Sequence, residues 1–73
     1  MNQLADELKE IVGNYTDEYN IKVDDEFVDL IVDYMPSNLM YDIILLARSL
    51  NYGFTIRPTL PQYSLELEFY KTL

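Results

Sequence analysis

The spacing of the hydrophobic side chains changes near Gly53, and this change constrains the fold more than any other feature of the sequence. Before Gly53, apolar residues recur every three to four positions, a spacing typical of helices that pack through one face. After Gly53 they alternate with polar residues, which is typical of strands with one buried face. The sequence therefore predicts a small α+β domain in which three helices are followed by a C-terminal β-hairpin.

The helices are expected at residues 2–19, 25–35 and 39–52. Asp24 is a good N-cap for the second helix, since its carboxylate can accept a hydrogen bond from an unpaired N–H of the first turn. Pro36 ends that helix because a proline disfavours helical backbone in the residue before it. Gly53 is expected to end the third helix in a left-handed conformation.

The two strands of the hairpin are expected in "FTIRPTL", residues 54–60, and "YSLELEFY", residues 63–70. In the second strand, Tyr63, Leu65, Leu67 and Phe69 point to one side, and Ser64, Glu66, Glu68 and Tyr70 point to the other. Arg57 is expected to face Glu66 or Glu68 across the hairpin.

The chain of 73 residues is expected to form one domain, residues 1–73, without a linker or an internal repeat. Three helices followed by a hairpin resemble a winged-helix domain in element order. That resemblance implies that the third helix would read DNA and the hairpin would be the wing. Arg48 is the one basic residue of the third helix, so we do not expect this chain to bind nucleic acid directly.

Several kinds of chemistry lack their usual residues in this sequence. There is no histidine and no cysteine, which removes the commonest general base, the thiol nucleophiles and the usual zinc ligands. No glycine-rich phosphate loop is present, and a calcium-binding loop starting at Asn14 or at Asp17 lacks the required residues. We therefore expect no enzyme activity, no catalytic residues, no metal site and no cofactor.

Membrane insertion is not expected, because the longest apolar stretch, residues 43–47, is far too short to span a bilayer. The N-terminal residues lack the basic and apolar regions of a signal peptide. The absence of cysteine fits a reducing compartment, so a cytoplasmic protein is expected.

Charge provides the first candidate site. The net charge is −8, from thirteen acidic and five basic residues. On a helix over residues 25–35, the first candidate surface forms one acidic arc, and residues before the connector extend it: Asp25, Glu26, Asp29, Asp33, Asp17 and Glu18. Asp25 and Glu26 suit the helix dipole, whereas Asp29 and Asp33 each repel the preceding aspartate by about 0.2–0.5 kcal/mol. The arc is either a solvated helix face or a contact surface for a basic partner.

Aromatic residues provide the second candidate site. Tyr41, Leu45, Arg48 and Tyr52 recur at i, i+4, i+7 and i+11 and would share a narrow face of the third helix. Tyrosine and arginine around an apolar residue are typical of interface hot spots. The alternatives are that the hairpin covers this face, or that an AT-rich coding sequence favours tyrosine.

Together these features predict a non-enzymatic acidic inhibitor that occupies a basic, nucleic-acid-binding surface of another protein. In composition the chain resembles phage-encoded inhibitors of host defence and nucleic-acid enzymes, such as anti-restriction and anti-CRISPR proteins. The resemblance implies a protein partner in the host cytoplasm. The alternative is an assembly module that associates with itself or a partner through the helix at 39–52 or the strand at 63–70. The sequence leaves open whether the chain is a monomer or a homodimer.

Overall fold

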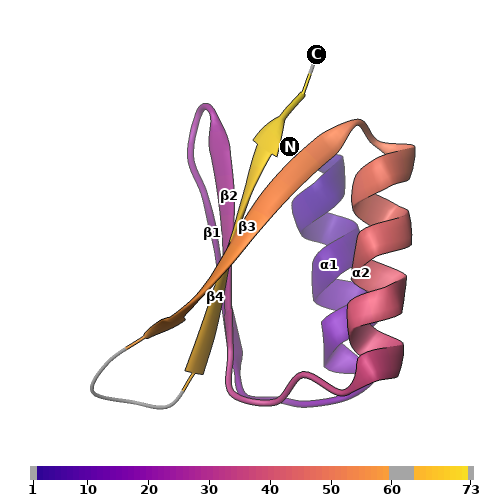
Figure 1. Ribbon diagram of the computed structural model, residues 1–73, viewed down its shortest axis with the longest axis vertical. Helices are drawn as coiled ribbons and strands as arrows, with labels where there is room; N and C mark the ends of the chain where they lie inside the picture. The colour runs from indigo at the N-terminus through magenta and orange to yellow at the C-terminus, as the bar shows by residue number, and fades with distance from the viewer. Residues whose placement is uncertain (1, 60–63, 73) are drawn as a thin grey trace.

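The computed structural model describes residues 2–59 and 64–72, and within them the chain forms two helices and four strands. The elements are, in order, α1 (Gln3–Gly13), β1 (Tyr19–Val23), β2 (Phe27–Val32), α2 (Ser37–Ser49), β3 (Tyr52–Thr59) and β4 (Ser64–Lys71). The strands form one antiparallel sheet in the order β1-β2-β4-β3. Both helices lie side by side on one face of this sheet (Figure 1). The architecture is therefore a two-layer α/β sandwich with one sheet face uncovered by any described helix.

The core lies between the helices and the two central strands. The sheet contributes alternate residues of β2 and β4, namely Val28, Leu30, Val32, Leu67 and Phe69. The helices contribute Leu4, Ala5, Leu8, Val12, Leu39, Ile43, Leu46 and Ala47. No described polar or charged residue is buried, so burial of apolar surface is the main stabilising term.

The predicted helix at residues 25–35 is wrong. The segment is the β1–β2 turn followed by β2, in which buried and more exposed residues alternate. Val28, Ile31 and Val32 satisfy helical spacing, while Val28, Leu30 and Val32 satisfy alternation, so the period alone does not separate helix from strand in so short a run. The β-branched side chains favour the strand. Asp24 caps an N–H as predicted, but that of Asp25 in the turn, at 2.8 Å, instead of one in a helix.

The order of three helices followed by a C-terminal hairpin is therefore wrong, and so is the winged-helix order. The first helix also ends earlier than predicted, at Gly13, and Tyr19 belongs to β1. The third predicted helix is α2, and the left-handed residue after it is Asn51, with φ 62°, instead of Gly53. What remains confirmed is the α+β class.

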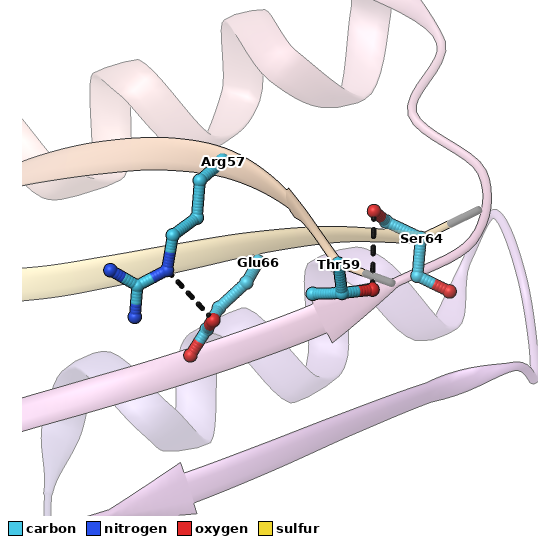
Figure 2. Close-up of polar contacts among 4 residues, drawn as sticks. All are labelled: Arg57, Thr59, Ser64 and Glu66. Atoms are coloured by element: carbon cyan, nitrogen blue, oxygen red, sulfur yellow. Dashed lines mark hydrogen bonds and ion pairs between the residues drawn. The ribbon is translucent and has the colours of Figure 1, made fainter. Parts of the chain in front are cut away.

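The antiparallel pairing of the last two strands is confirmed. Leu67 pairs with Ile56 in register, and Leu67 and Phe69 are buried as the alternation predicts. Arg57 Nε donates to Glu66 Oε1 at 3.0 Å, and the Thr59 hydroxyl donates to the Ser64 carbonyl at 3.4 Å (Figure 2). Leu60 and Tyr63, which the predicted strands include, lie outside the described residues.

The fold contains a structural repeat that the sequence analysis missed. Each half is one helix followed by a β-hairpin, and the strand order reads the same when the halves are exchanged. A pseudo-two-fold axis therefore passes between β2 and β4, at the Leu30–Leu67 pair. Core positions of the halves correspond, Leu4 with Leu39 and Leu8 with Ile43, each 35 residues apart. Because each unit places its helix on the same side, the repeat leaves the opposite face of the sheet open.

Candidate functional site

The open sheet face is the surface that the helices leave uncovered. Its residues alternate with the core residues along each strand, and the register places them together. They are Asn20 and Lys22 on β1, Phe27, Asp29 and Ile31 on β2, Glu66, Glu68 and Tyr70 on β4, and Gly53, Thr55 and Arg57 on β3. The acidic and aromatic side chains of this face lie on the central strands β2 and β4, and its basic side chains lie on the edge strands β1 and β3.

The carboxylates of this face occupy its centre. Asp29 on β2 lies directly opposite Glu68 on β4, and Glu66 is two residues along the same strand. Neighbouring strands lie about 4.8 Å apart, and alternate residues of one strand about 6.7 Å apart. All three carboxylates therefore fall within about one Debye length, 8 Å at physiological salt, so that a partner experiences their charges together. We call Asp29, Glu66 and Glu68 the carboxylate cluster.

The basic residues of the face lie on the edge strands, at its sides. Arg57 on β3 forms an ion pair with Glu66, and its side chain is 59% exposed. The hydrogen bond from Arg57 to Glu66 and the charge of Glu66 raise the pKa of the guanidinium, with smaller contributions from Glu68 and Asp29, while partial burial opposes them. Lys22 pairs in register with Asp29 from β1, but no ion pair within 4.0 Å joins these two residues. One arginine thus compensates the cluster in part.

Asp29 is the most unusual member of the cluster. Its Oδ1 is shielded from solvent, yet no described residue donates a hydrogen bond to it. Polar atoms shielded in this way are paired in most folded proteins, because an unpaired one loses its hydrogen bonds to water without replacement. The carboxylate also faces Glu68, and like charges directly opposite each other across two strands are destabilising. No described residue supplies a donor to this oxygen, so Asp29 carries a local cost in the folded state.

The structure separates the residues of the predicted acidic arc. Asp25 and Glu26 lie in the β1–β2 turn, and Asp29 lies in the middle of the open sheet face. At the far end, Glu18 precedes β1 and Asp33 follows β2, and both line one shallow hollow of about 270 Å³ with Ser64. Asp17 is exposed next to Glu18. The predicted helical row does not exist, but its members mark the two ends and the centre of the sheet.

Glu66 and Glu68 were not named as candidate site residues from the sequence. Their signal was present in the alternation of "SLELEF", which already directed both glutamates outward. What was missing was the neighbouring strand, since residues 25–35 were predicted as a helix. Without β2 beside β4, nothing placed Asp29 against Glu68.

The second predicted surface is kept in part. Tyr41, Leu45 and Arg48 are exposed on α2, with Tyr41 62% and Leu45 48% exposed. Tyr52 is not on the helix, because it begins β3 and packs against the core. The predicted strand at 63–70 corresponds to β4, which has β2 on one side and β3 on the other, so it offers no free edge to a partner sheet.

Ligand chemistry gives little further direction. In residues 2–59 and 64–72, no group of three or more acidic side chains is arranged to hold a metal ion. None of the helices in these residues is long and apolar enough to cross a membrane.

Comparison of the chain with protein-family models, with curated proteins and with solved structures found no match. Functional reasoning therefore depends on the open sheet face itself.

Proposed function

We propose that this chain is a non-enzymatic binding protein whose open sheet face occupies a basic, nucleic-acid-binding surface of another protein. The single observation that carries the proposal is the unpartnered Oδ1 of Asp29 at the centre of the carboxylate cluster. An arginine or lysine of the partner would pair with the Asp29 carboxylate and would also relieve the repulsion between Asp29 and Glu68. The net charge of −8 favours encounter with basic surfaces and disfavours nucleic acid.

A nucleic-acid site is the basic surface that fits this proposal best. Such sites carry clustered lysine and arginine side chains that hold phosphates, and a sheet with closely spaced carboxylates offers them a comparable set of negative charges. The chain would then act as a competitive inhibitor, as phage-encoded inhibitors of host defence do. We place its action in the cytoplasm, where the absence of cysteine is compatible with reducing conditions.

The proposal can be tested by capture followed by elution with nucleic acid. The immobilised chain is exposed to a bacterial lysate and washed, and bound proteins are then released with double-stranded DNA. We expect DNA to release nucleic-acid-binding proteins. The amount captured should fall as the salt concentration rises. The Asp29→Asn/Glu68→Gln variant should bind these proteins more weakly, by roughly fivefold in affinity, or about 1 kcal/mol, for each exposed charge pair that is lost.

A matched control separates the surface from the net charge. The variant Asp6→Asn/Glu10→Gln removes the same two charges from exposed positions on α1, away from the open sheet face. We expect this variant to capture the same proteins as the unchanged chain. If the two variants lose binding equally, charge without a defined surface explains the capture, and the proposal is wrong. If DNA releases nothing, the proposed competition with nucleic acid is wrong.

The alternative of an assembly module now rests on α2 alone, because β4 is an internal strand. Tyr41 and Leu45 are exposed and could contact a second copy. Sedimentation at several concentrations tests this alternative. A concentration-dependent dimer that Tyr41→Glu abolishes would favour it over the inhibitor.

A further inference from the structure

A hollow lies at one end of the open sheet face, between the β1–β2 turn and the ends of β3 and β4. Its volume is about 550 Å³. The β1–β2 turn and the C-terminal end of β4 lie at the same end of the molecule (Figure 1). Two kinds of residue dominate the lining: the aromatic residues Phe27, Tyr52 and Tyr70, and the turn acids Asp24, Asp25 and Glu26. We call this hollow the aromatic–acidic pocket.

Two of the rings are held in place by the sheet. Phe27 and Tyr70 are cross-strand neighbours, and each is partly open to solvent, 39% and 38% exposed. Tyr70 also lies opposite Gly53 on the other side, where a Cβ would stand 2.8 Å from the tyrosine ring. The glycine therefore makes room for the ring to lie across β3, in the way an aromatic side chain covers a bare strand position. The Tyr70 ring is thus fixed on the β3 side, and Phe27 lines the pocket from β2.

A positive charge already sits beside the third ring. The Lys71 ammonium lies 5.8 Å from the centroid of the Tyr52 ring, within the range of a cation–π interaction. Lys71 is the one basic residue in the lining, against three acids, so the pocket keeps a net formal charge of −2. Asp24 accepts the Asp25 N–H, but no described residue donates to the carboxylates of Asp25 or Glu26. The pocket therefore has room, aromatic surface and unused negative charge for a second cation.

We propose that the aromatic–acidic pocket binds the guanidinium group of an arginine side chain from the basic partner. This inference rests on the proposed function for the source of the arginine, but not for the chemistry of the pocket. A guanidinium is planar and weakly hydrated, so it stacks on aromatic rings and donates two parallel hydrogen bonds to one carboxylate. The pocket offers both groups at one place, Phe27 and Tyr70 for stacking and Glu26 for hydrogen bonding. A lysine ammonium can make the charge contact, but it cannot stack on a ring or donate two parallel hydrogen bonds to one carboxylate.

Continuity with the open sheet face decides how the pocket would be used. Phe27 and Tyr70 belong to both surfaces. Phe27 lies two residues before Asp29 on β2, and Tyr70 lies two residues after Glu68 on β4. A basic surface lying on the carboxylate cluster would therefore bring a neighbouring arginine to the pocket. The cluster would attract the partner through its field, and the pocket would anchor one side chain.

The pocket can be tested without the partner. The ¹⁵N-labelled chain is titrated at constant ionic strength with acetyl-Gly-Arg-Gly-amide, and its amide shifts are followed by NMR. The same titration is made with acetyl-Gly-Lys-Gly-amide and with the uncharged citrulline peptide, which keeps the shape of arginine. We expect saturating shifts around Glu26, Phe27 and Tyr70 with the arginine peptide, and binding of the citrulline peptide roughly tenfold weaker. Equal binding of arginine and citrulline, or of arginine and lysine, would overturn the assignment.

Substitutions locate the binding. Glu26→Gln and Tyr70→Leu should each weaken the arginine peptide several-fold, and both alter exposed side chains that the core does not use. Their matched controls are Glu10→Gln on α1 and Tyr34→Leu, which is 56% exposed outside the pocket. Equal loss in a variant and its control would overturn the proposal.

The two proposals fail separately. The Asp29→Asn/Glu68→Gln variant should still bind the arginine peptide, because its changes lie outside the pocket lining. If the peptide binds but DNA-released capture is absent, the pocket stands and the inhibitor function is wrong. If capture depends on Asp29 and Glu68 but the peptide does not bind, the inhibitor function stands and the pocket is wrong.

Discussion

Asp29→Asn should make the protein more stable while it weakens partner binding. The substitution keeps the shape of the side chain and removes one negative charge from the carboxylate cluster. Two features of the folded state favour it: the position of Asp29 opposite Glu68, and the solvent-shielded Oδ1 that no described residue hydrogen-bonds. Under the proposed function, the protein would keep these charges for binding at a cost in stability.

The size of the effect follows from competing terms. Relief of a like-charge pair directly across two strands contributes about 0.2–1 kcal/mol. Loss of the attraction between Asp29 and Lys22 opposes this gain. Because Lys22 is exposed and makes no ion pair within 4.0 Å of Asp29, the stability lost with this attraction lies near the lower end of about 0.2–1 kcal/mol. Relief of the unpaired oxygen adds to the gain, because an amide loses less than a charge when shielded. We expect a net gain of about 0.5–1 kcal/mol, which for a domain of this size raises Tm by about 2–8 °C.

Thermal and urea unfolding measured by circular dichroism at two salt concentrations would test this reasoning. The gain should shrink at about 1 M salt, where the Debye length is only about 3 Å. Glu68→Gln should give a similar gain, and the double variant less than the sum, because both changes relieve the same repulsion. Asp33→Asn is the control, since Asp33 follows β2 outside the strand pairing and should change stability by less than about 0.5 kcal/mol. A loss of stability in Asp29→Asn, or a gain that salt does not reduce, would refute the argument.

Three further predictions concern the fold around the site. Burial raises the pKa of the Tyr15 phenol, and the charge of Asp42 and the 3.4 Å hydrogen bond from Tyr15 to Asp42 raise this pKa further. ¹³Cζ NMR should therefore show Tyr15 ionising above about 10, and Asp42→Asn should lower that pKa. Since the folded state holds this proton more tightly, the stability it contributes is present below the unfolded pKa and is lost as pH rises through the folded one. Gly53→Ala should cost about 1–2 kcal/mol in urea unfolding, because its Cβ meets the Tyr70 ring, and much less in a Tyr70→Ala background; equal costs in both would contradict the contact. Leu67→Ala should cost about 3 kcal/mol, because Leu67 is fully buried in a central strand, and a cost below about 1 kcal/mol would contradict that position.

The parts of the fold that the sequence predicted well are those with one clear period. Residues 37–49 are apolar around most of a helix, and residues 64–71 alternate strictly, so α2 and β4 were found within a few residues. The segment at 25–35 was ambiguous because Val28, Ile31 and Val32 fit the helical period while Val28, Leu30 and Val32 fit the strand period. Charges reinforced the wrong choice, since acids at helical spacing formed a coherent arc although two of them, Asp25 and Glu26, belong to the β1–β2 turn.

The candidate site was found only in part because it is made by strand pairing. Asp29 was singled out because it would repel the preceding aspartate in the predicted helix, whereas in the strand it lies opposite Glu68 instead. Glu68 lies 39 positions further along the chain, and only the pairing of β2 with β4 places it opposite Asp29. The structural repeat escaped notice for a similar reason, because its halves share the positions of core residues more than their identities.

The arrangement of charge on the open sheet face argues against solubility as its sole purpose. A sheet face that only needs to stay in water is served best by opposite charges placed across neighbouring strands, which also stabilise the pairing. Two cross-strand pairs on this face meet that need, Lys22 with Asp29 and Arg57 with Glu66, whereas Asp29 and Glu68 oppose each other on the central pair of strands. Exchanging a central acid for a base would keep the face polar and would remove the repulsion. Under the proposed function, the negative charge at the centre of the face would meet the basic surface, and Lys22 and Arg57 at its sides would limit how that surface can be placed.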